Sequence, residues 1–169
     1  MTSMIRHPRM ILPGAVLFAA CAGGSDGVEA QSAARDACEL LPASVVEEVA
    51  GVALQAEDLG RTETWSACGY LDPTDGMPAL EIQVTWSGGK EKAAEEVDPS
   101  LASMHPVDAL GDGAWLSTYE GRRSLVLEGD VLVEFHLALL PDASLQMMQD
   151  NDALRERFET LARSVLSSL

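Results

Sequence analysis

The C-terminal segment has the clearest pattern of apolar and polar positions in the chain. Apolar side chains recur there every three or four residues, at Leu154, Phe158, Leu161, Ala162, Val165, Leu166 and Leu169. Because an α-helix turns once every 3.6 residues, these side chains lie along one stripe and predict an amphipathic helix. Asp150, Asn151 and Asp152 precede the stripe, and side chains of these types commonly cap helix N-termini.

Alternation with a period of two predicts strands elsewhere in the chain. Residues 80–86 alternate cleanly, with Leu80, Ile82 and Val84 on the side that we expect to be buried. A short strand is predicted at 52–56 and a further strand at 65–71. Helices are predicted at 43–50, between Pro42 and Gly51, and at 90–97, where Ser87-Gly88-Gly89 is expected to cap the N-terminus.

Residues 114–139 predict a meander of three strands, at 114–119, 123–128 and 131–139. The two connections are short and contain Gly121 and Gly129, as hairpin turns prefer. Helices and hairpin-linked strands in this order predict an α+β domain. We expect a mostly antiparallel sheet with a C-terminal three-strand meander, and helices packed on one face of that sheet.

The N-terminus has the pattern of a secretory signal. Arg6 and Arg9 precede an apolar run at 10–20, which is far shorter than the ~20 residues of a membrane-spanning helix. Leu17-Phe18-Ala19-Ala20-Cys21 resembles the lipobox of bacterial lipoproteins, in which Cys21 would carry the lipid and become the mature N-terminus. Alternatively, Ala20-x-Ala22 is an ordinary cleavage site, and Cys21 is then removed.

The predicted organisation therefore has three parts. Residues 1–20 form a lipoprotein signal peptide, 21–34 a flexible tether rich in glycine and serine, and 35–169 a single α+β domain. A lipidated Cys21 would hold the domain on the extracytoplasmic side of the cell membrane. Cleavage after Ala22 would release it as a secreted protein.

With Cys21 assigned to the anchor, two cysteines remain in the domain. Export places Cys38 and Cys68 in an oxidising compartment, which favours a disulfide. A reactive thiol or a metal-binding role is the alternative, but neither cysteine belongs to a C-x-x-C motif or has a histidine nearby.

The chain is strongly acidic, with a formal net charge of −16 at pH 7. Such a charge repels nucleic-acid phosphates, so no nucleic-acid partner is expected. The same charge suits a cationic partner or a high-salt habitat, and it also serves solubility alone.

Two short motifs resemble catalytic patterns. Gly23 to Gly27 matches the G-x-S-x-G nucleophile elbow, but it lies in the tether with no strand before it. Ser87 to Lys90 matches the S-x-x-K of penicillin-recognising enzymes, but the S-D-N and K-T-G elements of those enzymes are missing. We interpret the first as linker and Ser87 as a helix cap.

Candidate binding residues are few. Glu128, Glu134 and His136 are weak candidates for a transition-metal site, with a solvated strand face as the alternative, and no cofactor is expected. Trp65, Trp86 and Trp115 lie on predicted strands, where packing is the usual role of tryptophan. If two of them lined a groove beside the sheet, that groove would be the ligand-binding candidate.

Three segments carry a resemblance to a known class of proteins. They are Asp36 to Pro42, Ala67-Cys68-Gly69-Tyr70, and Val107 to Trp115. Together with the lipobox they resemble small bacterial envelope lipoproteins of the actinobacterial type. The resemblance implies surface anchoring, a Cys38–Cys68 bridge and a secreted α+β domain, and it supplies no catalytic residues.

These observations lead us to expect a lipid-anchored extracytoplasmic binding or accessory domain rather than an enzyme. Its partner would be a small hydrophobic ligand, a peptide or an envelope protein. A metal-assisted hydrolase of the cell envelope is one alternative. A structural or inhibitory subunit of an envelope complex is the other.

Overall fold

The structure is a computed structural model that describes residues 35–97, 104–117, 123–137 and 151–169. The predicted signal peptide at 1–20, the lipidation residue Cys21 and the tether at 21–34 lie outside the described residues. None of the described helices is long and apolar enough to cross a bilayer.

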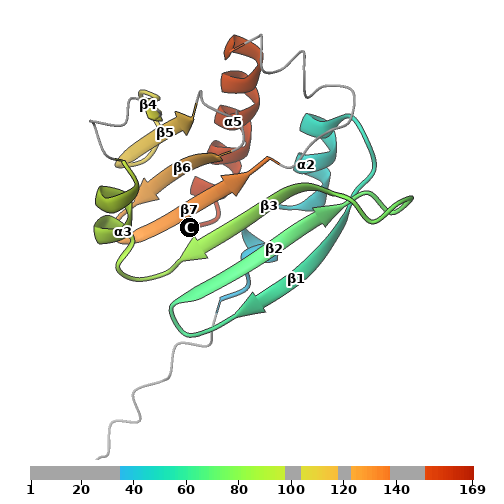
Figure 1. Cartoon of the computed structure of the whole chain (residues 1–169), viewed down its shortest axis with the longest axis horizontal. Coiled ribbons are helices and arrows are strands. Elements are labelled where there is room, and N and C mark those ends of the chain that lie inside the picture. The colour runs from blue at the N-terminus through green and yellow to red at the C-terminus, as the bar shows by residue number, and fades with distance from the viewer. Residues whose placement is uncertain (1–34, 98–103, 118–122, 138–150) are drawn as a thin grey trace, which may run out of the picture. The chain divides into compact units, whose positions relative to one another are not determined.

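The described residues form a seven-stranded antiparallel sheet in the order β1-β2-β3-β7-β6-β5-β4 (Figure 1). The strands are β1 (Gln55–Arg61), β2 (Trp65–Leu71), β3 (Pro78–Thr85), β4 (Met104–Pro106), β5 (Gly113–Ser117), β6 (Arg123–Glu128) and β7 (Val131–His136). The helices are α1 (Ala37–Leu40), α2 (Ala43–Ala50), α3 (Gly89–Glu96) and α5 (Asn151–Leu166). The α+β class, the antiparallel sheet and the β5-β6-β7 meander are therefore confirmed.

Two strands differ from the prediction. The first strand occupies 55–61 instead of 52–56, and all but one of its residues are exposed. It pairs only with β2 at one edge of the sheet, so it has no buried side chains to produce an alternating pattern. The short strand β4 at the opposite edge was not predicted at all. Its three residues give too little sequence for any periodicity, and it is recognisable only from its pairing with β5.

The main hydrophobic core lies between one face of the sheet and the helices α1, α2 and α5. Alternate residues of β3 and β7 point into it, among them Ile82, Val84 and Phe135. The ring of Phe135 meets that of Phe158 from α5 edge-on, with the ring centroids 5.7 Å apart. The predicted apolar stripe of the C-terminal helix is thus the surface that covers this face.

Helix α3 lies on the opposite face of the sheet, which departs from the expected packing of the helices on a single face. Ala93 packs there on Leu125, Leu127 and Leu132, which form a second, smaller apolar cluster. The four central residues of both β6 and β7 are buried, so these strands need cover on both faces. The short helix α3 supplies that cover, although most of its residues are polar. Its weak apolar pattern does not show which face of the sheet it covers.

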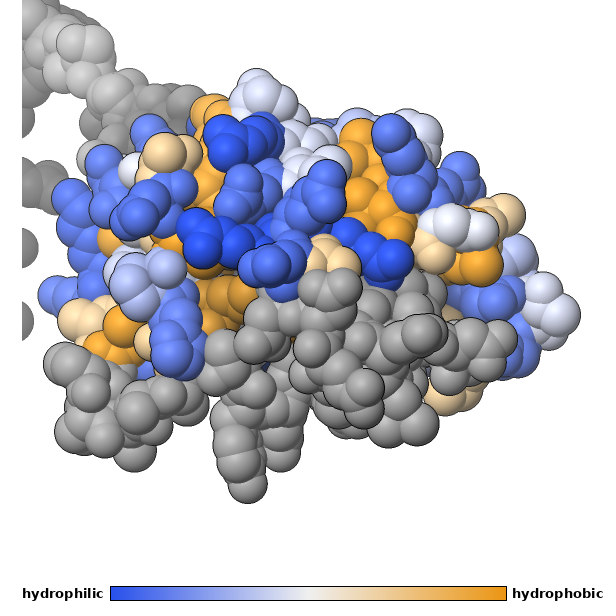
Figure 2. All heavy atoms as spheres, turned by 90° about the horizontal axis from the view of Figure 1, so that it is seen from above, coloured by the Kyte–Doolittle hydropathy of each residue, from blue (hydrophilic) through white to orange (hydrophobic). Residues whose placement is uncertain are grey.

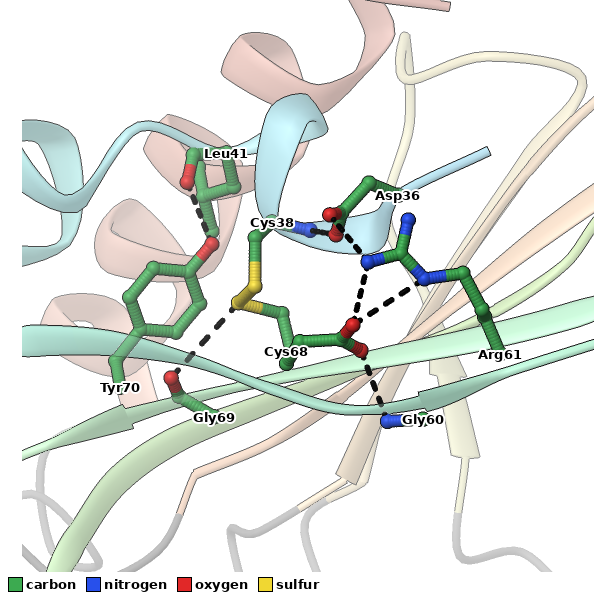
Figure 3. Close-up of a disulfide and its surroundings, with 9 residues drawn as sticks. Asp36, Cys38, Leu41, Gly60, Arg61, Cys68, Gly69 and Tyr70 are labelled. Carbon is green, nitrogen blue, oxygen red and sulfur yellow. Dashed lines mark hydrogen bonds and ion pairs between the residues drawn. A yellow bond between two sulfur atoms is a disulfide. The ribbon is translucent and has the colours of Figure 1, made fainter. Parts of the chain in front are cut away.

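The disulfide between Cys38 and Cys68 is present and joins α1 to β2 (Figure 3). The Asp36 carboxylate accepts a hydrogen bond from the Cys38 N–H at 2.9 Å. It also forms an ion pair with Arg61 at 3.0 Å. Beside the bridge, the buried Tyr70 hydroxyl donates to the Leu41 carbonyl at 2.5 Å. This region ties the start of the domain to β2, the second strand from one edge of the sheet.

Candidate functional site

The three tryptophans do not share one groove. Trp86 packs against the main core, donates its Nε1–H to Ser66 Oγ at 2.9 Å, and lies under Arg35. Trp65 lies on the other face of the sheet, at the start of β2. Trp115 is on the same face as Trp65, but β2 and β5 are separated by four strand spacings, roughly 19 Å.

Of the three metal candidates, only Glu134 and His136 lie close together. In the β6-β7 ladder Glu134 is opposite Leu125, whereas Glu128 is opposite Val131. Glu128 is therefore three pairs away from Glu134 and on the other face of the sheet, so it does not join Glu134 and His136 in the predicted metal site. Within the described part of the chain, no group of three or more histidine, cysteine or carboxylate side chains could hold a metal ion.

Glu134 is instead the centre of a buried ion-pair cluster beneath α3, and its side chain is only 3% exposed. Lys92 of α3 and Arg123 of β6 each donate to one of its carboxylate oxygens, and Arg123 also binds Glu96 at 2.6 Å. His136 Nε2 lies 3.9 Å from the same carboxylate. The alternative of a solvated strand face is therefore also wrong for Glu134.

The charges in this cluster compensate one another. Burial by itself raises the pKa of Glu134, but the hydrogen bonds from Lys92 and Arg123 outweigh burial and lower that pKa. The hydrogen bonds that Arg123 donates to Glu96 and Glu134 raise the pKa of Arg123, and the bond to Glu96 has the larger effect. We interpret the cluster as the electrostatic attachment of α3 to the sheet, because each of its carboxylates is bound by a cation.

An open groove of about 610 Å³ lies on the same face, between α3 and β5. Its walls come from α3, from the end of β6 and from the segment that leads into β5. Most of the exposed lining is apolar, and the volume is within the range of sites that bind small molecules or side chains. The lining residues are Lys90, Ala93, Ala94, Val97, Asp112, Trp115 and Leu127.

The backbone around Trp115 requires glycine at two positions. A Cβ at residue 113 would lie 2.3 Å from the Trp115 ring, so the ring fits only because Gly113 has no side chain. Gly111 has a φ of 55°, and a Cβ there would lie 2.4 Å from the Leu127 carbonyl. The Gly111-Asp112-Gly113 segment thus holds Trp115 against the sheet at the edge of the groove.

The opposite wall is held by the β6-β7 turn. The Asp130 carboxylate accepts hydrogen bonds from the Gly88 N–H at 2.7 Å and the Lys90 N–H at 3.3 Å, and its carbonyl accepts one from Gly89 at 2.9 Å. A Cβ on Gly89 would lie 2.5 Å from that carbonyl, so the helix can approach the turn only at a glycine. Asp130 therefore caps α3, in place of the predicted cap Ser87.

Asp112 attaches the other wall to the same turn, because its carboxylate accepts a hydrogen bond from the Gly129 N–H at 3.0 Å. Asp112 and Asp130 are thus site residues that sequence reasoning missed. The signal in the sequence that could have located the site is its glycine-rich segments. Three of them, Gly88-Gly89, Gly111-x-Gly113 and Gly129, come together at the β6-β7 turn. Which of the glycine-rich segments would meet depended on the strand order.

Two other hollows are less suited to hold a ligand. An apolar hollow between α2 and α5, next to Leu80 and Leu161, holds only about 20 Å³, which is little more than one water. Figure 2 views the molecule from the side on which α2 and α5 lie in Figure 1, and hydrophobic residues appear there as separate patches between hydrophilic ones. The hollow beside Trp86, of about 320 Å³, is mostly polar, and Arg35 already stacks on the Trp86 ring at 5.4 Å.

Comparisons with protein-family models, with curated proteins and with solved structures find no match for this chain. The assignment of a function therefore depends on the residues and geometry of the groove itself.

Proposed function

We propose that this chain is a lipid-anchored extracytoplasmic binding domain, and that the groove between α3 and β5 is its ligand site. The observation that carries the proposal is the Trp115 ring, which lies on Gly113 at the edge of an open, mainly apolar groove. A large aromatic side chain beside small ones provides apolar contact area and a defined shape for a ligand.

The structure of the groove supports a binding role because both walls are attached by hydrogen bonds to the same turn. Asp130 holds α3 through three backbone N–H groups, and Asp112 holds the opposite wall. A groove that is already shaped loses little conformational entropy when a ligand enters it. The nearby charged groups of Glu134, Lys92 and Arg123 bind one another, so they are engaged in holding α3.

The anchored location rests on the sequence around Cys21 together with the disulfide, which suits an oxidising compartment. Metabolic labelling with palmitate tests the anchor directly. We expect label in the wild-type chain and none in a Cys21→Ala variant. An unlabelled wild-type chain would show that the protein is instead released after cleavage.

Ligand binding is tested by NMR on the full chain labelled with ¹⁵N, using a library of short peptides with aromatic or aliphatic side chains. We expect the Trp115 indole resonance to shift in a saturable manner. Trp115→Leu should abolish the binding, whereas Trp65→Leu, a matched change on the same face of the sheet, should preserve it. A library that shifts no resonance of the groove, or that binds the Trp115→Leu variant equally well, would contradict the proposal.

A further inference from the structure

The charges around the groove indicate which partner it takes, and this inference rests on the binding function proposed above. We infer that the groove binds a peptide segment of a partner protein that carries an apolar side chain next to a lysine or arginine. The apolar side chain would lie on Trp115, and the cationic one would face the carboxylates at the β6-β7 turn.

The open form of the groove favours a chain segment. Pockets for small molecules usually enclose most of the ligand surface, whereas this groove is open to solvent between a helix and a strand. Ala93 and Ala94 on the helical wall are small, which leaves space for side chains of an entering segment. A peptide bound there would leave its backbone at the surface and insert single side chains.

The charge at one end of the groove is negative. Asp112 lines the groove, and Asp130 holds the α3 wall at the adjoining turn. Lys90 is the single cation among the residues that line the groove, so Asp112 and Asp130 together give this end two negative charges against one positive charge.

The Asp130 carboxylate keeps its charge while it supports the fold. Hydrogen bonds from the backbone of Gly88 and Lys90 lower the pKa of Asp130, so it stays ionised at neutral pH. A carboxylate has about four lone-pair positions, and a few backbone N–H donors do not occupy all of them. A cation that enters beside Trp115 would therefore gain both electrostatic attraction and contact with the aromatic ring.

The experiment compares four probes by NMR titration of the full chain at low and physiological salt. They are the peptides acetyl-Lys-Phe-Lys-amide, acetyl-Glu-Phe-Glu-amide and acetyl-Lys-Ser-Lys-amide, and the small cation phenylalanine amide. We expect the Lys-Phe-Lys peptide to bind most tightly, about tenfold better than the acidic peptide, and to weaken as salt rises. The Ser peptide should lose most of the binding because it lacks the apolar anchor.

Variants test the carboxylates separately from the fold. Asp112→Asn keeps an oxygen that accepts from the Gly129 N–H but removes the charge, and should weaken the Lys-Phe-Lys peptide about three- to fivefold. Glu63→Gln removes one charge from the hairpin between β1 and β2, and should leave the affinity within about 1.5-fold.

The outcomes distinguish the two proposals. If the acidic peptide binds as tightly as the basic one through Trp115, the cationic partner is excluded while the binding function stands. If phenylalanine amide alone matches the peptide, the site takes a small cation and the peptide assignment fails. If no probe shifts Trp115, both proposals fail.

Discussion

The two faces of the sheet are stabilised in different ways. One face is closed by α1, α2 and α5 over a continuous apolar core that includes Phe135 and Phe158. The other face carries α3 only over β6 and β7, where the helix is held by the Glu134 ion pairs and by the Asp130 cap. The first arrangement stabilises the fold without directional contacts, while the second depends on a few specific ones.

Under the proposed function, this difference separates stability from binding. Apolar burial on the face covered by α1, α2 and α5 supplies most of the favourable free energy of folding, in proportion to the apolar area removed from water. The α3 face is therefore free to keep an open groove and a set of exposed carboxylates. The following predictions test this separation, starting with the largest expected effect.

Loss of Phe158 should destabilise the domain most. Its side chain is fully buried and meets Phe135 edge-on, so Phe158→Ala removes large apolar contacts and leaves a cavity. We expect a loss of about 3–5 kcal/mol in the free energy of unfolding, measured by urea denaturation. Phe158→Leu, which retains most of the volume, should cost much less. A loss below about 1 kcal/mol for the alanine variant would mean that α5 does not hold this face closed.

The disulfide should contribute nearly as much on the same face. Removing the Cys38–Cys68 bridge, which spans 30 residues of sequence, should cost about 3–4 kcal/mol through the entropy of the unfolded chain. Urea denaturation of the Cys38→Ala/Cys68→Ala variant measures this loss. Because the bridge lies far from the groove, the affinity for a peptide probe should not change in conditions where the variant is folded. A weakened affinity in the folded variant would contradict the separation of the two faces.

Glu134 should have a smaller but pH-dependent effect on the α3 face. Glu134→Gln removes the charge that binds Lys92 and Arg123, which are themselves about one-third exposed. We expect a loss of about 1.5–3 kcal/mol at pH 7. Glu96→Gln, at the more exposed end of the same cluster, should cost at most about 1 kcal/mol.

The pH dependence follows from the lowered pKa of Glu134. An unfolded chain has the ordinary glutamate pKa of about 4.3. The stabilisation is therefore fully present above that pH and is lost as the pH falls through the lower pKa of the folded state. Urea denaturation between pH 3 and 7 should show the difference between wild type and Glu134→Gln shrinking below about pH 4. A constant difference across this range would show that the glutamate charge is not its source.

The parts of the fold that were predictable from the sequence have strong periodic patterns. The stripe from Leu154 to Leu169 and the alternation of Leu80, Ile82 and Val84 each reflect one buried face, and both predictions were confirmed. The pairing of Cys38 with Cys68 was predicted from the cysteine number and the expected export signal, and it is present in the structure. Strand β1 was misplaced because an exposed edge strand has no buried face to produce a pattern.

The site was much less predictable. Trp115 was a candidate, but only together with Trp65 and Trp86, which lie elsewhere in the fold. Glu134 and His136 alternate with apolar residues, so the sequence predicted a solvated face, whereas α3 covers Glu134 and supplies Lys92 as its partner. Local periodicity shows that a residue alternates with its neighbours, but not what covers the face on which it lies.

The sequence by itself therefore determined the periodic elements, the antiparallel class and the disulfide, because these depend on local spacing, hydrophobicity and cysteine number. Only the tertiary structure decided which face α3 covers, which carboxylate is buried and where the groove lies. Those features arise when Gly88-Gly89, Gly111-x-Gly113 and the turn at Gly129 meet across the strand order β7-β6-β5. Close approach of backbones far apart in the sequence has no periodic signature, so the groove appears only once the strands are paired.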